Sequence, residues 1–122
     1  QDGRSRANSL RQSRFIPAVE YLQANRQRRR LINEMHEIMK DLDVLISPTF
    51  GGSQLLITNL TGHPVVSVPT GLDKSNHPTS LTLVGNLYDE EVILLLAKAF
   101  QKRTEFDEMY PPDYLPGKLE NK

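Results

Sequence analysis

The sequence contains no cysteine and no tryptophan, and its longest apolar run extends only from Val92 to Ala97. Without cysteine the chain has no disulfide, no thiolate ligand for a metal and no cysteine nucleophile. The absence of cysteine also fits a reducing compartment, so we expect a cytoplasmic protein. The apolar run is far shorter than the ~20 residues that span a bilayer, so we expect no membrane association.

The chain also lacks net charge, because 15 lysines and arginines balance 15 aspartates and glutamates. This balance disfavours a dedicated nucleic-acid binder. The charges are unevenly spread: residues 1–40 are mainly basic, residues 41–88 carry few charges and residues 89–122 are mainly acidic. A middle part so poor in charge is typical of strands that are covered on both faces, and the charged parts are typical of helices and tails around them.

Two segments have helical patterns. Residues 17–41 combine helix-forming residues with apolar positions three and four apart, which predicts an amphipathic helix with Pro17 at its first position. Asp89 is a suitable N-cap for a second helix that continues to about Thr104. The first two turns of this second helix are apolar on nearly every side, so a domain of this size cannot cover them fully.

Three short segments are predicted to be strands: Asp43–Ser47, Val65–Pro69 and Ser80–Val84. Pro69–Gly71 is expected to end the second of them. Turn-forming residues separate the second strand from the third, which indicates an antiparallel hairpin. The apolar segment Leu55–Leu60 fits either a strand or a helix, and Gly62 stops it in both cases.

The length of 122 residues allows one domain. We expect residues 1–14 to form a loosely ordered segment with a short helical turn near Ala7–Gln12. Residues 15–106 form the body in this interpretation, and residues 107–122 form a tail.

The sequence contains few motifs of known catalytic or ligand-binding sites. No histidine pair has the spacing of a metal site, no G-x-S-x-G motif surrounds a serine, and no glycine-rich phosphate loop is present. We therefore expect no metal, no cofactor and no catalytic residue in this chain.

The cluster Arg26–Arg30 is interpreted as a solvated helix face in preference to a phosphate or RNA contact. Asn25 or Arg26 is expected to hold a neighbouring loop by hydrogen bonds.

Several motifs follow one another in a distinctive order. They are the helical segment Tyr21–Arg26, the strand end Ser47–Thr49, the segment Asn59–Pro64, the turn Val68–Gly71 and the closing helix Ala97–Thr104. In this order they resemble the C-terminal part of the amidase signature family. The resemblance covers residues 14–106, and its specificity comes from the order of the motifs more than from any one of them.

The resemblance implies an α/β fold in which helices pack on a small mixed β-sheet, as the C-terminal portion of an α/β/α sandwich. It implies a parent enzyme that hydrolyses carboxamide C–N bonds with a Ser–Ser–Lys triad. The triad lies in earlier parts of such enzymes, so this chain is expected to be an inactive C-terminal fragment. Its expected partners are the missing N-terminal part, a small amide substrate of the parent and, through exposed apolar faces, further copies of itself.

The same resemblance places Asn59, Thr61 and Gly62 beside the substrate cleft, although helix capping and a tight turn explain the same residues. The family has a longer insertion where this chain has only Phe50–Thr58, which implies a small pocket wall.

Two alternatives to an amidase fragment remain open. One is a self-standing interaction module that uses the helix around Arg26–Arg30, and the other is part of a tRNA-dependent amidotransferase A subunit.

Overall fold

The computed structural model describes residues 6–49 and 51–114. In these ranges the longer elements are α1 (Arg6–Gln12), α2 (Ala18–Met39), β1 (Val44–Pro48), α3 (Gln54–Thr61), β2 (Val65–Leu72), β3 (Pro78–Gly85) and α4 (Glu90–Thr104). Short 3-10 turns cover Ser13–Phe15, Phe106–Glu108 and Pro112–Tyr114. The predicted N-terminal segment and tail lie partly outside the described residues.

The sheet has the strand order β1-β3-β2, and both strand pairs are antiparallel. The hairpin predicted from the turn residues is confirmed, and it places β2 on one side of β3, while β1 pairs with the other side. The predicted α/β class is confirmed as well. The predicted mixed sheet differs from the described strands, because β1 and β2 run parallel to each other but never meet: β3 separates them.

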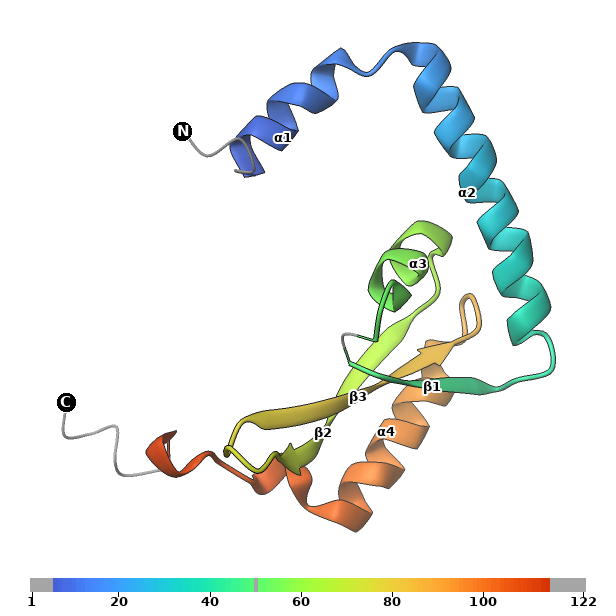
Figure 1. The fold of residues 1–122 in the computed structure, drawn as a ribbon. Helices are drawn as coiled ribbons and strands as arrows, with labels where there is room; N and C mark the ends of the chain where they lie inside the picture. The colour runs from blue at the N-terminus through green and yellow to red at the C-terminus, as the bar shows by residue number, and fades with distance from the viewer. Residues whose placement is uncertain (1–5, 50, 115–122) are drawn as a thin grey trace.

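Helices cover the two faces of this sheet from opposite sides (Figure 1). On one face, Val68 and Leu83 pack against Ile93 and Ala97 of α4. On the other face, Val84 packs with Met35 and Met39 of α2. Successive residues of a strand point to opposite faces, so Leu83 and Val84 place one apolar side chain in each core.

The segment that fitted either a strand or a helix forms α3, and Gly62 ends it with a left-handed φ of 86°. The end of β2 differs from the sequence prediction. Pro69 does not end β2, which continues to Leu72 through an irregularity between Pro69 and Gly71. Proline is tolerated there because β2 is an edge strand, where the missing N–H removes no ladder bond from a second neighbour.

The helix ends agree with the predictions apart from details of capping. Pro17 lies at the N-cap of α2 and not at its first helical position, because its ψ of 147° is extended. Asp89 occupies the predicted N-cap of α4, but its side chain makes no capping hydrogen bond. Within the described residues, no helix has the length and apolar character that crossing a membrane requires.

Large apolar side chains remain uncovered on several helices, including α2 and α4. On α4, Ile93 and Ala97 are buried, whereas Leu94 and Leu95 are 56% and 60% exposed. The first half of α2 extends away from the sheet together with α1 (Figure 1), and Leu22 on this arm is exposed. The expectation that a chain of this size cannot cover its closing helix is therefore confirmed.

The packing of β3 against α4 leads to a prediction about Gly85. A Cβ atom at Gly85 would lie 2.8 Å from Cγ2 of Ile93 and 3.3 Å from the carbonyl oxygen of Asp89. We expect Gly85→Ala to lower the free energy of unfolding by about 1–3 kcal/mol, the usual cost of overpacking, in urea denaturation. Ile93→Leu removes the clashing Cγ2 at similar volume, so the same alanine should cost at least about 0.5 kcal/mol less in that background. Equal costs in both backgrounds would contradict this contact.

Candidate functional site

Three hydroxyl groups form a row across the sheet on the face that carries α3. Ser67 of β2 and Thr82 of β3 are cross-strand partners, and their hydroxyl oxygens lie 3.3 Å apart. Thr49 follows β1, and its hydroxyl oxygen lies 3.1 Å from that of Thr82. The side chain of Thr82 is buried, so this hydroxyl depends on its two neighbours for hydrogen bonding.

A cavity of about 200 Å³ lies beside this hydroxyl row. Its walls are formed by Thr49, Gln54, Leu55, Val65, Ser67 and Thr82. Gln54 is the first residue of α3, and its amide nitrogen Nε2 is buried without a hydrogen-bond partner in the described part of the chain. An unpaired buried donor costs about 1–3 kcal/mol, so this amide is a feature that requires an explanation.

The residues that the sequence placed beside a cleft lie at the opposite end of α3. Asn59 is exposed, Thr61 is buried and Gly62 is the C-cap of the helix. None of them is among the residues that form the walls of this cavity. Their capping and turn role is visible in the structure, and their proximity to a substrate cleft stays a prediction.

Thr61 and His63 form a buried pair behind the end of α3. The Thr61 hydroxyl donates to the carbonyl oxygen of Ile57 at 2.9 Å, and its oxygen lies 2.8 Å from Nδ1 of His63. Because a hydroxyl has one proton, Nδ1 of His63 carries the proton of the second bond and donates to Thr61. Burial, and then the nearby His36, lower the pKa of His63 below its usual value.

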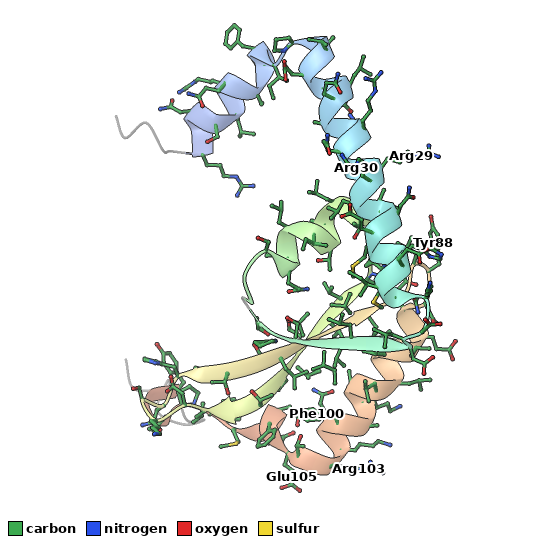
Figure 2. The ribbon with its side chains drawn as sticks, turned by 45° about the vertical axis from the view of Figure 1, so that its right-hand side comes forward. Arg29, Arg30, Tyr88, Phe100, Arg103 and Glu105 are labelled. Atoms are coloured by element: carbon green, nitrogen blue, oxygen red, sulfur yellow. The ribbon has the colours of Figure 1, made fainter. Side chains whose placement is uncertain are left out.

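The basic cluster on α2 contains the residue that holds a neighbouring segment. Arg28 donates from Nε to the carbonyl oxygen of Leu60 at 2.6 Å and thereby ties α2 to α3. Asn25 and Arg26, which were expected to do this, instead bond within α2, to the carbonyl oxygen of Tyr21 and to the side chain of Gln23. Figure 2 shows Arg29 on the side of α2 that points away from α3.

The walls of the cavity are polar in part and carry no charge. Its walls contain hydroxyl and amide groups but no lysine, histidine or carboxylate. Among the residues that the structure describes, no group of three or more His, Cys, Asp or Glu side chains could hold a metal ion.

The sequence prediction missed four residues that line the cavity, namely Ser67, Thr82, Thr49 and Gln54. The available signal was the placement of Ser67 between two valines and of Thr82 between two leucines, which aligns their polar side chains on one face.

The buried His63 predicts a dependence of stability on pH. Its pKa is lowered in the folded state, so below about pH 6.5 the unfolded chain binds more protons at this site than the folded chain does. The free energy of unfolding should therefore decrease as the pH falls from 7 to 5. In His63→Asn, whose amide can still donate to Thr61, this decrease should be smaller in urea titrations. His36→Asn should also reduce it, because that variant removes the second cause. An identical decrease in the native chain and in His63→Asn would contradict the assignment.

The bond between Arg28 and Leu60 leads to a second prediction. Arg28→Met keeps the helix propensity but loses the bond, so we expect a loss of roughly 0.5–1.5 kcal/mol in the free energy of unfolding. Arg29→Met is the matched control, since Arg29 points away from α3 (Figure 2), and it should change stability little. Equal losses in the two variants, measured by urea denaturation, would show that the contact with Leu60 contributes nothing.

Comparisons with known proteins place these features in a family context. No model of a known protein family matches the chain. The chain is 37% identical to the A subunit of the glutamyl-tRNA(Gln) amidotransferase from Ehrlichia chaffeensis, over 69% of this chain and 21% of that protein. It is 31% identical to the fatty acid amide hydrolase of Arabidopsis thaliana, over 73% of this chain and 19% of that protein.

The fold has a counterpart among solved structures. An amidase family protein from Bacillus anthracis superposes with a TM-score of 0.67 at 21% sequence identity, over 80% of this chain and 19% of that chain. The chain thus spans about one fifth of the length of the curated relatives and of the solved structure that it matches. The order of motifs, the relatives and the fold agree, and the chain is related to the C-terminal part of the amidase signature enzymes.

Proposed function

We propose that this chain forms the C-terminal part of an amidase that hydrolyses carboxamide C–N bonds, and that the chain by itself is inactive. The observation that carries the proposal is the match to about one fifth of the length of two amidase signature enzymes, together with the shared fold. The parent would use a serine nucleophile that a lysine activates, as the family resemblance implies.

The hydroxyl row and the cavity beside it support the proposed inactivity of the isolated chain. The hydroxyl of Ser67 lies beside Thr82, and no wall residue of the cavity is a lysine or a histidine. A serine hydroxyl is a weak nucleophile until a neighbouring base removes its proton. The described cavity therefore lacks the base that acyl transfer needs, and the triad must come from other residues of the parent.

The uncovered apolar surface supports a role as one part of a larger body. Leu94 and Leu95 on α4 and Leu22 on α2 are more than half exposed. Apolar patches of this kind mark interaction surfaces. The remainder of the parent enzyme is the partner that we propose for them, and in its absence the purified chain should associate with itself.

Two kinds of parent fit the relatives. The relative from Ehrlichia chaffeensis, at 37% identity, belongs to a glutamyl-tRNA(Gln) amidotransferase, so the second candidate for the parent is an amidotransferase of this kind. The interaction module is less well supported, because Arg28 of the basic cluster is already engaged with Leu60 inside the chain.

A chimaeric enzyme tests the proposal. We would replace the matching segment of the Arabidopsis fatty acid amide hydrolase by this chain, and compare it with the same enzyme lacking that segment. The chimaera should hydrolyse an amide at a measurable rate because the fold of the segment is shared, and the shortened enzyme should not. A chimaera that unfolds cooperatively and is nevertheless as inactive as the shortened enzyme would contradict the proposal.

The isolated chain provides the complementary measurement. Purified as it is, it should release no ammonia from short aliphatic amides above the rate without protein. Hydrolysis that disappears in Ser67→Ala would show that the chain carries its own nucleophile, and would overturn the proposed inactivity.

A further inference from the structure

The edge strand β1 leaves part of its backbone without hydrogen-bond partners. Thr49 donates from its backbone N–H to the carbonyl oxygen of Ser80 at 3.4 Å, so these two residues form a hydrogen-bonded pair. Such pairs alternate with non-bonded pairs along antiparallel strands, so the N–H and C=O groups of Val44 and Ile46 point away from β3. Among the described residues these groups make no hydrogen bond, and β1 therefore has a free edge.

The opposite edge of the sheet is less suited to a further strand. In β2, Pro69 has no N–H, and the register shifts between Pro69 and Gly71. Both features interrupt an outer ladder, and natural proteins use them to keep an edge from pairing. The register of β1 with β3 has no such shift, and β1 has no proline before Pro48. The free edge of β1 is thus the one that can accept a strand.

A second cavity lies beside this free edge, on the face of the sheet that carries α2 and α3. It has a volume of about 190 Å³, and its walls are formed by Met35, Ile38, Leu45, Gln54, Ile57, Thr58 and Val84. Five of these seven side chains are apolar, and Met35, Thr58 and Val84 are at most 7% exposed. A cavity of roughly 150 Å³ holds a benzene molecule, so this one has room for one large apolar side chain.

Gln54 adds one unpaired donor to this apolar cavity. Its Nε2 is buried and has no hydrogen-bond partner in the described part of the chain. The other polar wall residue is Thr58, whose hydroxyl already lies 3.2 Å from the carbonyl oxygens of Gln54 and Leu55. An occupant therefore needs one acceptor oxygen for Gln54 and otherwise an apolar surface, which would remove the cost of leaving this donor unpaired.

An extended polypeptide segment fits the free edge and the cavity at the same time. Its side chains alternate between the two faces, so every second one lies on the side of Leu45 and of the cavity. The others lie on the side of Ile46, which is 62% exposed and pairs with Leu83 of the core under α4. Both faces of such a segment meet apolar side chains, as in strands that are covered on both faces.

We propose that this cavity and the free edge of β1 bind an extended apolar segment from the part of the parent enzyme that lies outside this chain. The backbone of the segment pairs with Val44 and Ile46, and one aliphatic side chain fills the cavity beside Leu45. A backbone carbonyl oxygen of the segment accepts from Gln54. The chain spans about one fifth of its relatives' length, so the larger part of the parent is available to supply the segment.

This inference deepens the proposed function, because it names where the rest of the parent attaches, and it rests on that function for the source of the segment. The site itself rests only on the free edge, the cavity and the unpaired amide. The site and its source can therefore be tested separately.

The isolated chain tests the site with a defined ligand, a seven-residue peptide of alternating threonine and valine with blocked ends. In NMR of the ¹⁵N-labelled chain, the amide signals of Val44 and Ile46 and the side-chain NH₂ signals of Gln54 should shift with saturation. A peptide with glutamate in place of valine should bind at least about tenfold more weakly, because the cavity offers no partner for a charge. No saturable shift, or equal binding of the two peptides, would overturn the proposal.

Variants connect the binding to the amide and to the edge. Gln54→Leu removes the unpaired donor at similar size, so the isolated chain should be at least as stable in urea denaturation, whereas the valine peptide should bind at least about fivefold more weakly. A merely structural role of Gln54 would lower the stability instead. Ile46→Lys places a charge at the edge and should weaken binding by at least the same factor. Ser75→Lys, in the exposed turn between β2 and β3, is the matched control and should bind normally. Undiminished binding by Ile46→Lys would overturn the role of the edge.

The chimaeric enzyme tests the source of the segment through hydrogen exchange followed by mass spectrometry. The amides of Val44 and Ile46 should exchange at least about tenfold more slowly in the chimaera than in the isolated chain. The amides of Leu45 and Ser47, which pair with β3, are the internal reference. Equal exchange of Val44 and Ile46 in both proteins would overturn the proposal. Protection that disappears on dilution would assign the edge to a second copy and would overturn it as well.

The results also separate this proposal from the proposed function. Unprotected amides of Val44 and Ile46 in an active chimaera would refute the docking site alone. Peptide binding and protected amides in a folded but inactive chimaera would refute the amidase and leave the docking site supported. If the chimaera does not fold, the peptide titration of the isolated chain decides.

Discussion

The central strand β3 is the element on which the described fold depends. It pairs with β1 on one side and β2 on the other, so it holds both edge strands in place. Its residues Leu83 and Val84 are 2% and 0% exposed, and they belong to the two separate cores on the two faces of the sheet. Adjacent residues of this one strand therefore connect the layer of α4 with the layer of α2 and α3.

The second consequence of β3 is the position of the polar row. The residues that alternate with its leucines point toward α3, and Thr82 is thereby placed between Ser67 and Thr49. The helices α2 and α3 cover the end of this face at Val84, whereas the part at Thr82 borders a cavity. A single face thus changes from an apolar core to a polar surface within two residues of one strand.

Large leucine side chains of α4 and α2, such as Leu95, stay in contact with solvent in this chain. The proposed parent enzyme would supply a surface to cover them. The match to about one fifth of each relative's length agrees with that picture.

The sequence by itself determined the two long helices, the three strand segments, the hairpin and the family, because periodicity, turn residues and motif order are local signals. Only the tertiary structure decided that Leu55–Leu60 is helical, that β2 continues past Pro69 and that Arg28, not Asn25 or Arg26, holds α3. It also placed the polar cavity at the row around Thr82, away from Asn59, Thr61 and Gly62. The physical reason is that a hydroxyl row joins three segments distant in the chain, and their meeting depends on strand register, which no local pattern specifies.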